Sequence, residues 1–126
     1  MTNKEKFALR MQEAGVCDQR GAAFCATAAG LPDGSFGLCL LGVNGNELSI
    51  YDTDMKSNVG EKLYTIPLHG VTNVQINVGF MAELMKGFSF RFVYNGFTYT
   101  FKNCAQNKMA LNIIRQETGN GETFPH

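Results

Sequence analysis

Two Asn-Gly pairs, each set between two segments with the composition of β-strands, constrain most what this chain can fold into. Asn44-Gly45 and Asn95-Gly96 both offer the positive φ angles that a tight turn between antiparallel strands requires. The segments that they join are 35–43 with 47–52 and 88–94 with 97–102. Both pairs of segments therefore predict β-hairpins. In the first hairpin Leu48 and Ile50 share one face, and Ser49 and Tyr51 share the other.

Three further segments have strand patterns. Residues 22–28 are small and apolar and precede the turn sequence LPDG, and residues 62–66 alternate up to Pro67. Residues 71–79 give the clearest signal, because valine and isoleucine alternate with asparagine and glutamine. Residues 53–60 are polar and predict a loop. With the two hairpins, the count reaches seven short strands.

One amphipathic helix is expected at each end of this series. Residues 3–14 place Phe7, Met11 and Ala14 on one stripe, with Gly15 as the stop and Thr2 or Asn3 as the N-cap. Residues 105–117 form a more apolar helix that ends before Gly119.

The composition indicates one soluble domain spanning 1–126. Hydrophobic residues make up 44% and charged residues 17% of the 126 positions, and no apolar run is long enough to span a bilayer. The expected parts are a helix at 1–15, strands within 21–104, a helix at 105–118 and a tail at 119–126. Seven short strands bury alternating faces best as a barrel or sandwich, with one helix over an open end. An α+β open sheet with both helices on one face is the alternative.

The order of these elements, and above all residues 68–103 (LHGVTNVQINVGFMAELMKGFSFRFVYNGFTYTFKN), resembles the bacterial pleckstrin-homology-like (PH-like) family. The resemblance covers residues 21–117. It implies a mainly β fold, a seven-stranded antiparallel barrel closed by the C-terminal helix, to which the N-terminal helix is an addition. Eukaryotic pleckstrin-homology domains that bind phosphoinositides carry cations beside the first hairpin, whereas residues 28–35 have none and contain Asp33. No specific phosphoinositide binding is therefore expected, since Arg20 and Lys62 are scattered.

The residues that could do chemistry form no recognised catalytic order. His69 lies between strands, where we expect a local hydrogen bond, and His126 ends the sequence. Asp18 and Asp33 are the nearest carboxylates to Cys17 and the LPDG turn, without a nucleophile, base and acid at known spacings. The remaining patterns, Tyr51 to Asp54 and the 14 glycines, match neither a calcium loop nor a phosphate loop. We predict no catalytic, cofactor or metal residues and no enzyme.

Charge and cysteine usage indicate which partners and which cellular location to expect. Eleven basic residues balance eleven acidic ones, so no nucleic acid is expected as a partner. The four cysteines, Cys17, Cys25, Cys39 and Cys104, stand singly and are predicted to be buried reduced thiols. The first residues lack the apolar stretch of a signal peptide, which favours a cytoplasmic location.

One glycine-bracketed segment, residues 79–87, is a candidate interaction surface, and the alternative is that it folds back and covers one opening of the barrel. It contains Phe80, Met81, Leu84, Met85 and Lys86, and methionine suits adaptable contacts. The other aromatic cluster, Phe88, Phe90, Phe92 and Phe101, is assigned to the core.

These observations predict a non-enzymatic interaction module that binds a protein partner or forms an oligomer with itself, through an exposed strand edge or residues 80–85. The alternative is weak peripheral membrane association through the same segment, helped by the cations of the N-terminal helix. A small-ligand protein or an enzyme with an unrecognised pocket is the second alternative.

Overall fold

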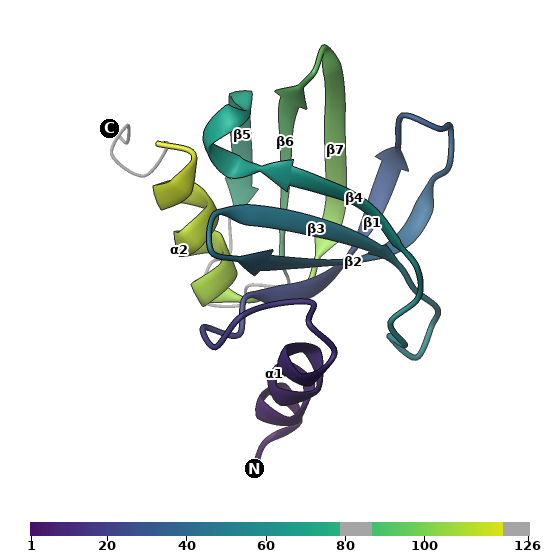
Figure 1. Cartoon of the computed structure of the whole chain (residues 1–126), viewed down its shortest axis with the longest axis vertical. Coiled ribbons are helices and arrows are strands. Elements are labelled where there is room, and N and C mark those ends of the chain that lie inside the picture. Colours follow the sequence, from purple (N-terminus) through teal and green to yellow (C-terminus); the bar gives the residue numbers. More distant parts are fainter. Residues whose placement is uncertain (79–86, 120–126) are drawn as a thin grey trace.

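Seven antiparallel strands form one curled sheet, with a helix at each end of the chain, in the computed structural model, which describes residues 1–78 and 87–119 (Figure 1). The helices are α1 (Asn3–Glu13) and α2 (Lys108–Glu117), and a short 3-10 turn, η1 (Leu68–Gly70), follows the fourth strand. The strands are β1 (Ala23–Gly30), β2 (Gly37–Asn44), β3 (Glu47–Asp52), β4 (Lys62–Pro67), β5 (Thr72–Val78), β6 (Phe88–Tyr94) and β7 (Phe97–Cys104).

The order of the strands across the sheet is β4-β3-β2-β1-β7-β6-β5. In Figure 1 the strands β2 to β4 cross in front of β5 to β7, and β1 joins the two halves. Both expected hairpins are confirmed, because Asn44 pairs with Glu47 and Tyr94 pairs with Phe97 across the two turns. Asn95 has φ 51°, the left-handed conformation that the Asn-Gly pair predicted.

The sheet curls into a half-barrel without closing, which corrects the expectation of a closed barrel. β4 and β5 are the two ends of the strand order, and within residues 1–78 and 87–119 no ladder joins them. Pro67 ends β4 without a backbone N–H, and η1 then turns the chain. Asn73, with φ 52°, lies where the pairing of β5 with β6 shifts register. These irregularities keep the two edge strands apart.

The main core fills the concave side of the sheet and the inner face of α2. Phe92 stacks on Tyr99 with ring centroids 5.1 Å apart, and Phe90 stacks on Phe101 at 5.3 Å. The prediction that the aromatic hairpin packs in the core is confirmed, since its four named rings are at most 5% exposed (Phe88, Phe90, Phe92 and Phe101). α2 adds four buried residues (Ala110, Leu111, Ile113 and Ile114).

The N-terminus of α2 differs from the expected one. The helix begins at Lys108 and not at 105, because Asn107 is its N-cap and accepts a hydrogen bond from the Ala110 N–H. The side chain of Asn107 also donates to the carbonyls of Gly21 and Ala23, which ties the helix start to β1.

A second, smaller core lies on the outer face of the sheet, beneath α1. Met11, Val16 and Leu40 are fully buried there. The cluster also contains Cys17, Ala23 and Tyr51. Since α1 and α2 pack on opposite faces, the alternative of an open sheet with both helices on one face is wrong. The α1 helix starts as predicted, with Thr2 as N-cap in a capping box with Glu5.

Candidate functional site

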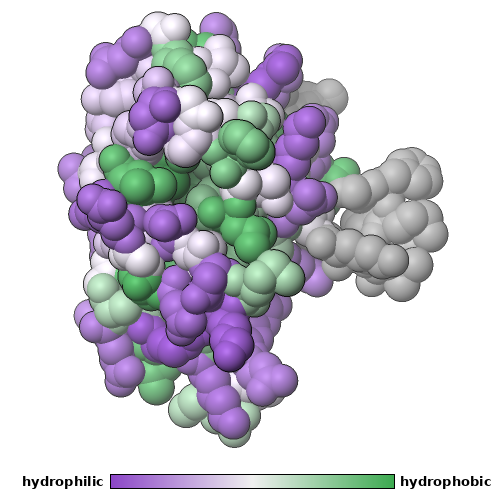
Figure 2. Space-filling model, turned by 90° about the vertical axis from the view of Figure 1, so that its right-hand side faces the viewer, coloured by the Kyte–Doolittle hydropathy of each residue, from purple (hydrophilic) through white to green (hydrophobic). Residues whose placement is uncertain are grey.

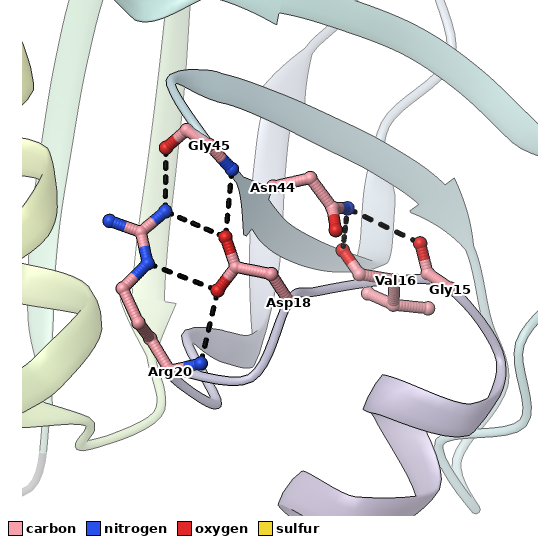
Figure 3. Close-up of polar contacts among 6 residues, drawn as sticks. All are labelled: Gly15, Val16, Asp18, Arg20, Asn44 and Gly45. Carbon is pink, nitrogen blue, oxygen red and sulfur yellow. Dashed lines mark hydrogen bonds and ion pairs between the residues drawn. The ribbon is translucent and has the colours of Figure 1, made fainter.

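The segment between α1 and β1 is held to the first hairpin by hydrogen bonds around Asp18 (Figure 3). The Asp18 carboxylate accepts from the Arg20 guanidinium at 2.8 and 3.0 Å and from the Gly45 N–H at 2.8 Å. The Arg20 guanidinium also donates to the Gly45 carbonyl. Beside this group, the Asn44 amide donates to the carbonyls of Gly15 and Val16. The network fixes where α1 lies on the sheet.

The same contacts perturb the titration of Asp18. Hydrogen bonds from the Arg20 side chain, followed by those from the Gly45 and Arg20 N–H groups, hold the pKa of this carboxyl well below its usual range. Asp18 and Arg20 are therefore an ion pair at neutral pH, and the pair joins the segment after α1 to the first hairpin.

A groove of about 770 Å³ lies between α1, the start of β1 and the start of α2. Phe7 and Ala8 come from α1, Ala23 and Cys25 from β1, and Met109 from α2. Met109 is 49% exposed, although it is a large apolar residue. The volume falls in the range of about 300 to 1,000 Å³ that is typical of ligand sites.

The polar side chains that line the groove are of two kinds, neutral amides and charged groups. Gln12, Gln19 and Gln106 are amides whose side chains form no hydrogen bond with another described residue. Lys4 on α1 and Lys108 on α2 are exposed ammonium groups, and in residues 1–78 and 87–119 neither forms a salt bridge. Arg20 also lines the groove, but Asp18 compensates its charge. Three cations and one carboxylate therefore line the groove, and the carboxylate, Glu5, lies on the same helix as Lys4 and offsets its charge.

The outer edge of β5 is the second surface with unused binding capacity. β5 is paired with β6 on one side, and no other described strand lies on its second side. Its apolar residues pack against the main core (Val74, Ile76 and Val78). Its exposed residues are neutral (Thr72, Asn73, Gln75 and Asn77). An edge strand presents unpaired N–H and C=O groups, which are a template for another strand.

The other edge strand, β4, carries two protective features that β5 lacks, whereas the one irregularity of β5 is the register shift at Asn73. β4 carries Lys62 at its start and Pro67 at its end, and both residue types discourage strand addition. The Lys62 ammonium group lies 6.0 Å from the centre of the Tyr51 ring, so it sits over β3. β5 has neither a charged residue nor a proline between Thr72 and Val78.

His69 lies in η1, between two strands as the sequence predicted, but its polar contacts are with residues distant in sequence and not local. Its Nε2 is 2.6 Å from Oε1 of Glu117, and its Nδ1 is 3.2 Å from the Asn46 amide. These contacts join η1 to the end of α2 and to the first hairpin. The second histidine, His126, lies outside the described residues.

The other carboxylates considered in the sequence form turns. Asp33 accepts from the N–H and hydroxyl of Ser35, and Asp54 accepts from the N–H groups of Lys56 and Asn58. Within the described part of the chain, no group of three or more His, Cys, Asp or Glu side chains could hold a metal ion. The structure thus does not bring Asp18, Asp33 and His69 into one recognised catalytic arrangement.

The four cysteines are reduced, and three of them are buried as predicted. Cys17, Cys39 and Cys104 are at most 3% exposed. Cys25 is the exception, because it is half-buried, lines the groove, and has its sulfur 3.1 Å from the Ser57 hydroxyl.

The candidate interaction surface from the sequence is not among the residues that the structure describes. Phe80, Met81, Leu84, Met85 and Lys86 lie outside the described residues, and so does the tail from residue 120. The exposed apolar residues that the structure does describe include two in connections between strands (Phe36 and Met55). Figure 2 shows separate hydrophobic patches among hydrophilic side chains on the face turned toward the viewer. Apolar residues that are scattered in this way are ordinary on protein surfaces.

Sequence reasoning missed the groove, because its walls come from opposite ends of the chain. The signal available was weak: Asn107, a good N-cap residue, could have moved the start of α2 to Lys108. Its contacts with Gly21 and Ala23, 86 and 84 residues away, have no signature in the local sequence.

Comparisons with known proteins give no family. No family model and no curated protein matches the chain. Among solved structures, the chain is similar to inner membrane complex sub-compartment protein 3 of Toxoplasma gondii, with 15% identity and a TM-score of 0.42 over 94% of this chain and 86% of that one. Neither described helix, of 11 and 10 residues, is long and apolar enough to cross a bilayer.

Proposed function

We propose that this chain is a non-enzymatic, PH-like interaction module that associates with a second copy of itself by strand addition at β5. The order of elements along the chain, seven antiparallel strands followed by a C-terminal helix, supports the PH-like part of this proposal. The observation that carries the proposal is the edge of β5, which has no charged residue, no proline and no second strand among the described residues.

Self-pairing of β5 has a defined geometry. When the seven residues Thr72–Val78 pair antiparallel with themselves, Gln75 lies at the centre, opposite Gln75 of the second copy. Directly opposed residues in an antiparallel pair have Cβ atoms about 4.5 to 5.5 Å apart. Two glutamine amides at this distance can donate to and accept from each other. A net charge of zero adds no long-range repulsion between copies.

A lysine at the centre of β5 tests the proposal. In Gln75→Lys the two ammonium groups of a pair would face each other, which costs about 1 kcal/mol at this distance in water, in addition to the lost amide contact. We expect the dimer dissociation constant, measured by sedimentation velocity over a concentration series, to rise about tenfold. Added salt should restore part of the affinity.

Thr65→Lys is the matched control. Thr65 is exposed on β4, the opposite edge of the same sheet, so this variant adds the same charge to an edge that is already protected. It should leave association unchanged. Equal weakening by both variants, or a wild-type chain that stays monomeric at all concentrations, would show that β5 is not the interface.

A further inference from the structure

We propose that the groove between α1 and the start of α2 binds an acidic segment of a partner protein, with an apolar anchor residue at the centre of that segment. This site uses other residues than the β5 edge and goes beyond self-association.

The balance of charge in the groove favours an acidic occupant, because three cations line it against one carboxylate (Lys4, Arg20 and Lys108 against Glu5). Lys4 projects from the first turn of α1 and Lys108 from the first turn of α2, so one ammonium group belongs to each wall. Among the described residues no salt bridge uses either charge. A segment with carboxylates near both of its ends would meet both lysines.

Apolar contacts and free amides select a peptide over a small anion. Phe7, Ala23 and Met109 line the groove from α1, β1 and α2, which gives it apolar surface for one apolar side chain. Gln12, Gln19 and Gln106 offer both donors and acceptors that no other described residue uses. A peptide backbone presents both donors and acceptors to such amides, whereas a small anion such as a carboxylate presents acceptors alone.

The walls of the groove are preformed. Asn107 holds the start of α2 against β1 by hydrogen bonds of 3.2 and 2.9 Å to Gly21 and Ala23. On the other wall, the side chains of α1 are so close to Gly21 that a Cβ there would lie 3.4 Å from the Ala8 methyl group. A preformed groove loses little conformational entropy when a ligand binds.

Fluorescence anisotropy with two short peptides tests this site. The probes are a fluorescein-labelled peptide with a Leu-Phe pair between two pairs of glutamates, and the same peptide with glutamines in place of glutamates. We expect the acidic peptide to bind about tenfold more tightly, with an affinity that falls as salt is added. At saturation it should also slow the alkylation of Cys25, which lines the groove. Equal affinity for the two peptides, or unprotected Cys25, would overturn the proposal.

Charge reversal locates the binding. The double variant Lys4→Glu, Lys108→Glu should weaken binding of the acidic peptide about tenfold, and it should fold normally because a carboxylate near a helix N-terminus is favourable. The control Lys56→Glu, Lys102→Glu makes the same change in net charge at two exposed lysines outside the groove. Equal weakening by both double variants would mean that net charge, and not this groove, governs binding.

Two further measurements distinguish peptide binding in the groove from lipid binding and from self-association at β5. Vesicles that contain phosphatidylglycerol should not bind through the groove. Vesicle binding that the Lys4→Glu, Lys108→Glu variant loses and its control retains would assign the groove to lipid and overturn the proposal of a peptide ligand. Gln75→Lys should retain peptide binding, so that a failure of the β5 proposal does not decide this one.

Discussion

Substitution of Gly42 by alanine should detach α1 from the sheet. Gly42 lies on the outer face of β2, and a Cβ there would be 2.1 Å from the carbonyl oxygen of Val16 and 2.6 Å from its Cγ1. Ordinary contacts are longer by about 1 Å or more, so the segment after α1 must lift from the sheet. Its φ angle is not in the left-handed region, so alanine is excluded by lack of space and not by backbone strain.

The cost has two parts. Overpacking of this kind costs about 1 to 3 kcal/mol. Lifting the segment also exposes part of Val16 and Met11, both now fully buried, and complete exposure of each would cost about 1.5 to 3 kcal/mol. We expect a loss of about 3 kcal/mol in the free energy of unfolding, since the exposure is partial.

Urea unfolding measures this difference, and Gly30→Ala is the matched control. Gly30 ends the neighbouring strand β1, and a Cβ there would have nothing within 4 Å. Its substitution should change the free energy of unfolding by less than about 0.5 kcal/mol. A Gly42→Ala chain as stable as the Gly30→Ala chain would refute the account of how α1 is held.

Two more results are expected. Asp18→Asn should lower the free energy of unfolding by about 1 to 2 kcal/mol at neutral pH, because it removes a charged pair with Arg20 that is partly exposed. Folding lowers the pKa of Asp18, so the stabilisation by this pair is complete above about pH 5 and is lost as the pH falls toward the folded-state pKa. The free energies of unfolding of the two proteins, measured by urea unfolding, should therefore converge in acid. Burial raises the pKa of the Cys39 thiol to about 12, so mass spectrometry after iodoacetamide treatment should find Cys25 modified first and Cys39 only after unfolding; early modification of Cys39 would contradict its burial.

The strands were predictable from the sequence because their signals are local. Asn-Gly turns and a two-residue period determine a hairpin within about a dozen residues, and both expected hairpins form. The second core was not foreseen, because an alternating strand such as 47–52 indicates one buried face. β2 did contain the missing signal: residues 39–43 are a continuous apolar run with one glycine, which is typical of a strand that is covered on both faces.

Closure of the sheet could not be predicted, because it depends on contacts between strands that are distant in sequence. The alternation of residues 71–79 is equally compatible with an edge strand and with an internal strand. What decides between them is whether a partner lies on the second side, and η1 and the bulge at Asn73 turn β5 away from β4. The groove was missed for the same reason, since contacts of Asn107 with β1 determine its position.

Both proposed surfaces depend on departures from a closed barrel with a single helix. An unpaired β5 edge exists because the described strands do not complete the ring, and the groove exists because α1 forms its second wall. The inner core can form without either feature, since neither Lys4 nor Gln75 is buried. Stability and binding are therefore divided between different residues, so that charge can be changed at β5 or in the groove at little cost to the fold. Gly42 is the exception, because the close approach of Val16 to this position supports the second core and one wall of the groove together.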